Sequence, residues 1–193
     1  MSFRRNLPNY LTYFRIAVIP ALIVVFFLRE YVGNWCYYLA AGLFIIASIT
    51  DWLDGYVARI WHAQSKVGRF LDPIADKLLV ATALLLLVSY EHADILPAIA
   101  IVCREILVSG LREFLAEIRI GVPVSRLAKW KTGVQMTAIS LLLLGKGGPD
   151  WLHAELLGSI LLWIAAILTL TTGYVYLKTG WKHMNEEDAT PQA

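Results

Sequence analysis

Charged residues are scarce in this sequence. Asp, Glu, Lys and Arg make up 17% of its 193 residues, against roughly 25% in an average soluble domain. The formal net charge is only +2, so the basic excess that is typical of nucleic-acid binding is missing and we predict no nucleic-acid partner. Internal repeats and low-complexity tracts are also lacking, and the length suits a single domain.

Cysteine is nearly absent as well. The two cysteines, Cys36 and Cys103, form neither a CxxC pair nor the spacing of a zinc site, and they fall in different apolar segments. The sequence therefore predicts neither a disulfide framework nor a thiol-based metal or redox centre.

Hydrophobic residues are abundant instead. They make up 58% of the chain, and the mean hydropathy is +0.60. A chain in lipid must pair its backbone groups internally, so only helices and closed barrels can span a membrane. The apolar runs show no strand-like alternation, which argues against a barrel. We predict an all-α fold, a polytopic membrane helix bundle.

Six apolar segments define the expected bundle, and most approach the ~20 residues needed to cross ~30 Å of hydrocarbon. The fifth is short unless it extends back through Lys129 and Lys131. The first ten residues predict a short interfacial helix. Residues 1–182 then form one membrane-embedded domain, and residues 183–193 form a polar tail. The six segments are 11–28, 35–58, 71–89, 95–115, 132–145 and 155–177.

The basic residues predict the orientation of the bundle, because connections on the cytoplasmic side are enriched in Lys and Arg. With both termini in the cytoplasm, the opposite side carries only Arg29 and Lys146. We therefore predict six transmembrane helices with an N-in/C-in topology. The cytoplasmic parts then carry eleven basic residues: Arg4, Arg5, Arg59, Lys66, Arg69, Arg119, Arg126, Lys129, Lys131, Lys178 and Lys182.

Four aspartates interrupt the second and third segments near their cytoplasmic ends. Asp51 and Asp54 are three residues apart, and Asp72 and Asp76 are four apart, so each pair shares one face of a helix. A connection of about a dozen residues can bring the two faces together. We expect four carboxylates to converge in one site.

Such a cluster is unfavourable unless its charge is compensated. Divalent cations would do this, and hard oxygen ligands suit Mg²⁺ or Mn²⁺ rather than zinc. The alternative is that the acids are solvated, or that they pair with nearby cations, namely Arg59, Lys66, Arg69 and Lys77. The paired helical spacing of all four favours the metal site.

Other residues of the same stretch suit a phosphate-bearing ligand. Gly55 and Ala58 are small enough to let a ligand or another helix approach the backbone. Arg59 could bind a phosphate with two hydrogen bonds, or serve only as a basic anchor. Gly68, just before the third segment, allows a turn.

These residues together resemble the signature of the CDP-alcohol phosphatidyltransferase family. The order Asp-x2-Asp-Gly-x2-Ala-Arg-x8-Gly-x3-Asp-x3-Asp is intact from Asp51 to Asp76. The resemblance covers most of the chain, because NLPNYLTYFRI, TDWLDGYVAR, FLDPIADK and CREILVSGLREF are similar to bacterial members that make phosphatidylglycerophosphate.

The resemblance implies a reaction and roles for the residues. The substrate would be CDP-diacylglycerol, and Asp51, Asp54, Asp72 and Asp76 would surround two Mg²⁺ ions, with Mn²⁺ as an alternative. Asp76 would also be the general base. The nucleotide-diphosphate would lie against Gly55, Ala58, Arg59 and Gly68. The resemblance further implies a homodimer in the bacterial inner (cytoplasmic) membrane, with a cytoplasmic active site beside membrane lipid.

The basic residues in and near the later segments point to an anionic acceptor. Arg104 and Arg112 are eight apart in the fourth segment, and arginines inside a membrane are costly and tend to be functional. With Lys129 and Lys131 they could bind the phosphate of sn-glycerol 3-phosphate. Alternatively, the arginines pair with nearby glutamates and the lysines are basic anchors. Arg15 is likewise either a pocket residue or a snorkelling side chain.

Three rival functions remain open at this stage. A related phosphatidyltransferase could use inositol phosphate, inositol or serine as its acceptor. A prenyltransferase also uses aspartate-rich motifs, although generally as two separated motifs in a longer bundle. A cation-coupled transporter would show a pathway to both faces and repeat-like symmetry. The acids of this chain cluster near one face, which disfavours the transporter.

Overall fold

The structure is a computed structural model that describes residues 2–61, 66–117 and 126–188. These residues form seven α-helices and two short 3₁₀-helices, without any β-strand, so the predicted all-α fold is confirmed for the part described. The helices are α1 Ser2–Phe27, α2 Arg29–Val32, α3 Trp35–Trp61, α4 Lys66–Ser89, α5 Ile95–Glu117, α6 Arg126–Leu144 and α7 Ala154–Asp188, with η1 Gly145–Gly147 and η2 Asp150–Leu152 between the last two.

Each of the six long helices overlaps one of the six predicted segments. The fifth, α6, does extend back through both lysines and begins at Arg126. The separate interfacial helix predicted for the first ten residues is wrong, because α1 is continuous from Ser2. No glycine, the residue at which helices most often end, lies within this stretch.

The last helix runs further than its apolar segment. Hydropathy placed the end of this segment at residue 177, whereas α7 continues to Asp188, into the part predicted as a polar tail. Lys, Met and Glu in this stretch are good helix formers. Hydropathy therefore indicated where the apolar surface of α7 ends, but the helix itself continues because the residues that follow favour helix.

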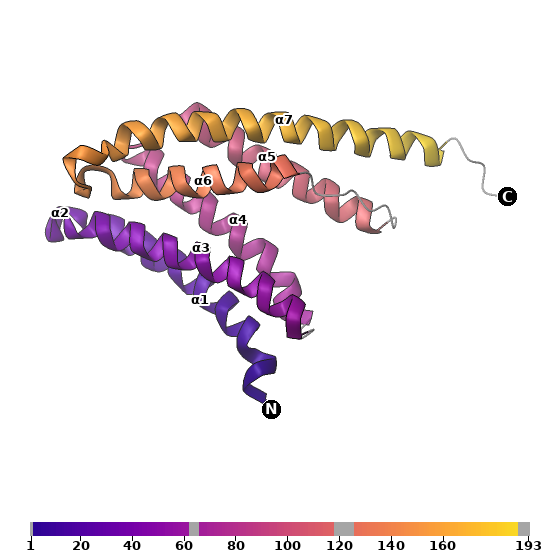
Figure 1. Cartoon of the computed structure of the whole chain (residues 1–193), viewed down its shortest axis with the longest axis horizontal. Coiled ribbons are helices and arrows are strands. Elements are labelled where there is room, and N and C mark those ends of the chain that lie inside the picture. The colour runs from indigo at the N-terminus through magenta and orange to yellow at the C-terminus, as the bar shows by residue number, and fades with distance from the viewer. Residues whose placement is uncertain (1, 62–65, 118–125, 189–193) are drawn as a thin grey trace.

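Two groups of helices make up the bundle (Figure 1). In the first group α1 packs against α3 and α4, and in the second α7 packs against α5 and α6. The groups meet where α3 contacts α6 and α4 contacts α5. The start of α1 and the end of α7 lie toward one end of the bundle, and α2, η1 and η2 lie at the other (Figure 1).

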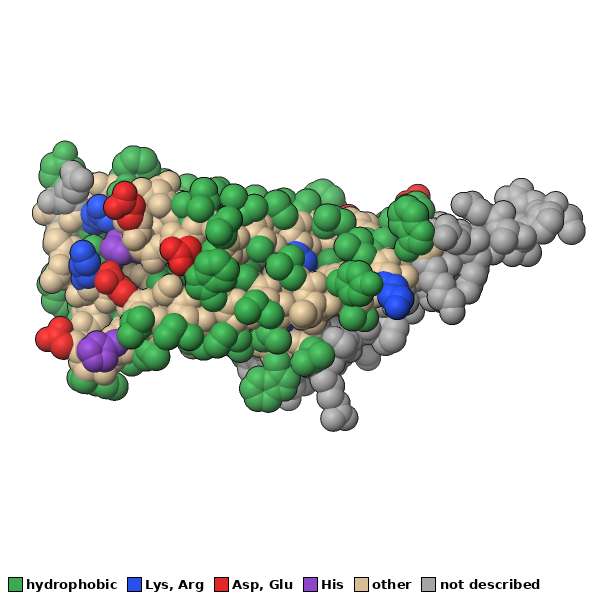
Figure 2. All heavy atoms as spheres, turned by 90° about the horizontal axis from the view of Figure 1, so that it is seen from above, with side chains coloured by type: hydrophobic (Ala, Val, Ile, Leu, Met, Phe, Trp, Pro, Cys, Tyr) green, Lys and Arg blue, Asp and Glu red, His purple; other side chains and the backbone are tan. Residues whose placement is uncertain are grey.

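The outer surface of the bundle is apolar. Figure 2 shows hydrophobic side chains along most of the described face that α7 forms, with charged side chains gathered at the end near η1 and η2. Large apolar patches on soluble monomers are rare, so this surface is typical of a protein in lipid. The exposed hydrophobic residues of α7 include Leu156, Ile160, Trp163, Ile164, Ile167, Leu170 and Tyr174.

Within the described residues, two helical stretches are long and apolar enough to cross a membrane, Tyr10–Phe27 and Asp150–Lys178. The apolar stretch Trp35–Asp51 is shorter. In α4 and α5 the apolar residues are interrupted by charges, among them Asp76 and Arg104. Asp76 and Arg104 line a cavity between the helices. These cavity-lining charges lower the mean hydropathy of the two helices that carry them.

His92, between α4 and α5, holds the end of the bundle near η1 together. Its ring has an exposed fraction of 8%, and Nδ1 lies 3.4 Å from Oε1 of Glu155 at the start of α7. Burial lowers the pKa of His92, although the Glu155 carboxylate opposes this. The neutral ring can then accept at Nε2 from Arg29 Nη1, which is 3.4 Å away. The contacts join α2 to α7.

Gly158 provides a test of the close contact between α6 and α7. A Cβ atom at this position would lie 2.8 Å from Cγ and 3.1 Å from the backbone nitrogen of Leu142. We expect Gly158→Val to lower the free energy of unfolding by about 1–3 kcal/mol, because overpacking forces the helices apart. SDS titration in mixed micelles would measure this change.

The matched control is Gly110→Ala on α5, where an added Cβ meets nothing within 4 Å. This variant should unfold at the same or a higher SDS fraction, because alanine favours a helix. Equal stability of Gly158→Val and the wild type would contradict the packing described.

Candidate active site

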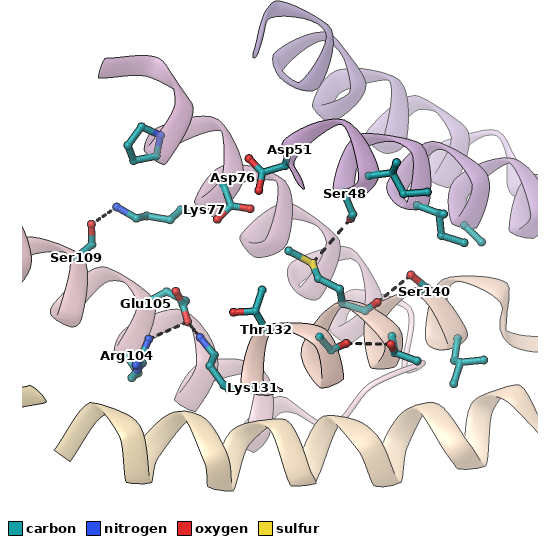
Figure 3. A pocket seen from close by; sticks show the side chains of 18 of the residues that line it. Ser48, Asp51, Asp76, Lys77, Arg104, Glu105, Ser109, Lys131, Thr132 and Ser140 are labelled. Atoms are coloured by element: carbon teal, nitrogen blue, oxygen red, sulfur yellow. Dashed lines mark hydrogen bonds and ion pairs between the residues drawn. The ribbon is translucent and has the colours of Figure 1, made fainter. Parts of the chain in front are cut away.

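A cavity of about 1470 Å³ lies between the two groups of helices. Its wall is divided (Figure 3). On the side toward the middle of α4 and α5 it is lined by polar and charged residues: Asp51, Asp76, Lys77, Arg104, Glu105, Ser109, Arg112, Glu113, Lys131 and Thr132. Along α3 and α6 it is mainly apolar, lined by Tyr38, Ala41, Gly42, Ile45, Ile49, Met136, Leu141 and Leu144.

Two of the four predicted acids reach this cavity from different helices. Asp51 comes from α3 and Asp76 from α4, and Figure 3 shows both carboxylates directed toward the same part of the cavity. Among the described residues, Asp76 makes neither a hydrogen bond nor an ion pair. Its carboxylate is thus available to a ligand in the cavity.

The third acid, Asp72, is held by α1. The Thr12 hydroxyl donates a hydrogen bond to Asp72 Oδ1, and Nη2 of Arg15 lies 3.4 Å from the same oxygen. Nη1 of Arg15 also forms an ion pair with Oδ1 of Asp51. One guanidinium therefore joins the carboxylates of α3 and α4. We call Asp51, Asp72 and Asp76 the acidic site.

Several predicted site residues fall where the structure does not describe side chains. Asp54, Gly55, Ala58 and Arg59 belong to the last turns of α3, and Lys129 belongs to the first turn of α6, but their side chains lie outside the described part. Gly68 is described, and it is buried near the start of α4.

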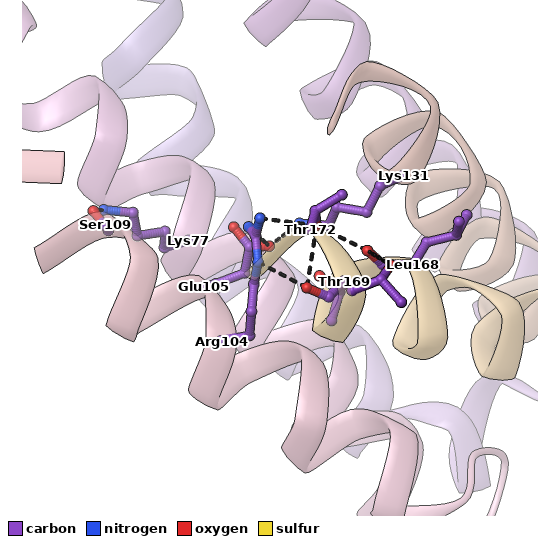
Figure 4. A network of polar contacts seen from close by, with 9 residues as sticks. Lys77, Arg104, Glu105, Ser109, Lys131, Leu168, Thr169 and Thr172 are labelled. Atoms are coloured by element: carbon purple, nitrogen blue, oxygen red, sulfur yellow. Dashed lines mark hydrogen bonds and ion pairs between the residues drawn. The ribbon is translucent and has the colours of Figure 1, made fainter. Parts of the chain in front are cut away.

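Arg104, which was predicted to bind a phosphate, forms most of its hydrogen bonds with α7 (Figure 4). Its Nε donates to the backbone oxygen of Thr169 at 3.1 Å, and its Nη2 donates to the Thr172 hydroxyl at 3.1 Å. Its stem packs on Gly173, where an added Cβ would lie 2.9 Å from Arg104 Cγ. A hydrogen-bonded arginine can therefore be buried between α5 and α7.

Glu105 joins Arg104 to the other buried cation of the cavity. Nη1 of Arg104 lies 3.3 Å from Glu105 Oε1, and Lys131 Nζ donates to the same oxygen. Lys131 has an exposed fraction of only 3%. The open alternative of arginine–glutamate pairing thus holds for Arg104, and Lys131 is a cavity residue rather than a surface anchor.

Arg112 differs from these two cations because it is exposed. Its Cζ lies 5.7 Å from the centroid of the Tyr176 ring, and no ion pair or hydrogen bond to another described residue holds it. Nearby, Lys77 Nζ donates to the Ser109 hydroxyl and lies 4.0 Å from Glu113 Oε1. Of the described cations at this part of the cavity, Arg112 is thus the one most free to bind an incoming anion.

Two polar partners, Thr12 and Ser109, could not be predicted from the sequence, because they had no distinguishing spacing. Glu105 was among the glutamates considered as partners of the arginines. Arg15, whose role the sequence left open, has an exposed fraction of 0%, so it does not snorkel. Its position inside an apolar segment was the sequence feature that indicated a contribution of α1 to the site.

The acidic site suits a hard divalent cation by its chemistry. The described donors are carboxylate oxygens, and the described lining of the cavity includes neither His nor Cys. Such donors fit Mg²⁺ or Mn²⁺. No group of three His, Cys, Asp or Glu side chains within the described residues is preformed around a metal position. Instead, the Arg15 guanidinium supplies the compensating charge.

A sequence model of the CDP-alcohol phosphatidyltransferase family matches residues 5–171. The chain belongs to this family. Among its relatives is the CDP-diacylglycerol–glycerol-3-phosphate 3-phosphatidyltransferase of Rickettsia bellii (strain RML369-C), 49% identical over 183 residues that cover 95% of this chain and 99% of that protein. A protein of the same name from Pseudomonas fluorescens is 43% identical over 188 residues, covering 94% and 93% of the two chains.

The contact between Glu105 and Lys131 can be tested by a double-mutant cycle. Glu105→Gln leaves Lys131 buried without its carboxylate, and we expect it to lower the free energy of unfolding by about 3 kcal/mol. The double variant Glu105→Gln/Lys131→Met should recover most of this loss, because the buried cation is gone. SDS titration would give the coupling free energy. A coupling near zero would contradict the pairing.

Proposed function

We propose that the chain transfers the phosphatidyl group of CDP-diacylglycerol to a hydroxyl of sn-glycerol 3-phosphate, which gives phosphatidylglycerophosphate and CMP. The observation that carries this proposal is the divided cavity, in which carboxylates and cations lie beside an apolar wall. A lipid with a diphosphate headgroup and a small anionic alcohol need such a combination. The names of the relatives agree with this reaction.

The apolar wall suits the lipid part of the first substrate. Ile45 and Ile49 on α3 face the cavity, as do Met136 and Leu141 on α6. Acyl chains against these residues would stay out of water, and the cytidine diphosphate would extend toward the acidic site. Gly55, Ala58, Arg59 and Gly68 would line the nucleotide-diphosphate, as the family signature implies.

Asp51, Asp54, Asp72 and Asp76 would hold the two divalent cations, Mg²⁺ or Mn²⁺. When bound, such cations neutralise a diphosphate and stabilise the oxygen of a leaving phosphate. Asp51 and Asp76 lie on the cavity wall, whereas Arg15 holds Asp72 from the α1 side.

Asp76 would act as the general base. It faces the cavity, and its carboxylate is free of hydrogen bonds to the described residues. In the proposed reaction it accepts the proton of the acceptor hydroxyl. The hydroxyl oxygen then bonds to the phosphorus that carries the diacylglycerol, the bond from that phosphorus to the CMP oxygen breaks, and CMP leaves.

The acceptor phosphate would bind beside the cations of α5 and α6 in the same polar part of the cavity. Among the described cations of this part of the cavity, Arg112 is the exposed one, and Lys131 could exchange its contact with Glu105 for a phosphate oxygen. Lys129, two residues earlier on α6, would add charge. Arg104 supports this group mainly by holding Glu105, because its guanidinium is occupied by α7.

The same proposal includes the setting of the enzyme. Six membrane-spanning helices with an N-in/C-in topology would place the acidic site at the cytoplasmic side of the bacterial inner membrane, where glycerol 3-phosphate is dissolved. The basic residues of the connections support this orientation. A homodimer is proposed on family resemblance.

Replacement of the general base tests the mechanism. Asp76→Asn keeps the size of the side chain but cannot accept the proton, so we expect turnover to fall by at least about 10²- to 10⁴-fold. CMP release from CDP-diacylglycerol and glycerol 3-phosphate by purified protein would measure it. Asp150→Asn, in η2, is the control and should retain full activity. Near-normal turnover of Asp76→Asn would reject the assignment, and an inactive wild type would reject the function.

Replacement of Arg112 tests the acceptor site. Loss of one charge-assisted contact should raise the KM for glycerol 3-phosphate about tenfold, with little change in the KM for CDP-diacylglycerol. Initial rates of Arg112→Gln at varied acceptor concentration would show this. Lys178→Gln, which removes an exposed cation of α7, serves as the control. An unchanged acceptor KM in Arg112→Gln would exclude the proposed contact.

A further inference from the structure

Helix α1 presents two polar side chains to the acidic site. Thr12 and Arg15 are three residues apart, so they lie on one face of the helix. Thr12 has an exposed fraction of 1% and Arg15 of 0%. The other buried side chains of α1 that the structure describes are apolar and include Val18 and Leu22, so Thr12 and Arg15 form the polar part of this buried face.

Their contacts are directed at carboxylates rather than at the backbone of a neighbouring helix. Thr12 donates its hydroxyl hydrogen to Asp72. Arg15 meets Asp51 through Nη1 and Asp72 through Nη2. The two acids come from α3 and α4, 36 and 57 residues along the chain from Arg15. Three helices thus meet at one guanidinium.

The exposed fractions of the three side chains show on which side Arg15 contacts the two carboxylates. The side chain of Arg15 is 1% exposed, whereas those of Asp51 and Asp72 are 41% and 25% exposed. Each carboxylate is therefore held on its buried side and keeps an accessible side. A planar guanidinium fixes the orientation of a carboxylate more closely than a point charge does.

We propose that Thr12 and Arg15 are positioning residues of the acidic site, which fix Asp51 and Asp72 in the orientation that binds a divalent cation. This inference rests on the proposed function, since the cation is the one required for phosphatidyl transfer. Partners that orient metal ligands in this way typically change metal affinity by about 10- to 100-fold when they are removed. Neither residue needs to touch the substrate.

The test is the affinity for Mn²⁺ without substrate. Full-length protein in detergent micelles would be titrated with Mn²⁺, and free Mn²⁺ would be followed by electron paramagnetic resonance. Thr12→Val keeps the shape of the side chain but removes its donor, and we expect its affinity to fall at least about tenfold. Thr12→Ser keeps the hydroxyl and should remain within about twofold of the wild type.

A second variant addresses the guanidinium. Arg15→Lys keeps the positive charge but cannot hold two carboxylates in a fixed plane, so we expect a similar loss of Mn²⁺ affinity. If this variant does not fold, Thr12→Val still decides the proposal. The matched control is Thr171→Val, because the Thr171 hydroxyl donates only within α7, to the Leu168 oxygen at 3.0 Å. It should bind Mn²⁺ like the wild type.

Two readouts separate positioning from simple packing. A purely structural role would lower the melting temperature of Thr12→Val and leave its Mn²⁺ affinity within about twofold of the wild type, which would overturn the proposal. Active wild-type protein with unchanged affinity in both Thr12→Val and Arg15→Lys would overturn it as well. Protein that binds Mn²⁺ as predicted but releases no CMP would refute the proposed function alone.

Discussion

The structure depends on how negative charge is held inside an apolar bundle. Asp51 and Asp72 approach one another from two helices, and their repulsion would separate α3 from α4 without a compensating charge. Arg15 supplies that charge from a third helix. A buried arginine would itself be unfavourable without these acids. The ion pairs therefore join α1, α3 and α4 and also prepare the place where we propose that metal ions bind.

In the second group of helices, buried positive charge is compensated by an acid. Arg104 and Lys131 are cations between α5, α6 and α7, and Glu105 lies between them. Arg104 is further satisfied by oxygen atoms of α7. The cavity thus has acids on one group of helices and mainly cations on the other. This arrangement suits a reaction in which a diphosphate and a second phosphate must lie close together beside lipid.

Much of this fold could be predicted, because each long helix contains a long apolar run. The two pairs of acids at helical spacing predicted one shared site. The partners of the acids could not be predicted, since contacts such as Thr12 to Asp72 join residues 60 positions apart and depend on how helices pack. The contacts of Arg104 with α7 could not be predicted either. Residue spacing places a side chain on one face of a helix, but it does not show which other helix packs on that face. The length of α7 was predicted too short, because the apolar residues end near residue 177 whereas helix-forming residues continue to Asp188.

The central claim is that a lipid diphosphate and an anionic alcohol react in this cavity. The most direct measurement is metal-dependent CMP release by purified protein in micelles that contain CDP-diacylglycerol, with glycerol 3-phosphate, glycerol, serine, inositol and inositol phosphate supplied separately. We expect release with glycerol 3-phosphate alone, and only when Mg²⁺ or Mn²⁺ is present. Release with a neutral alcohol instead, or no release with any acceptor from folded protein, would contradict it.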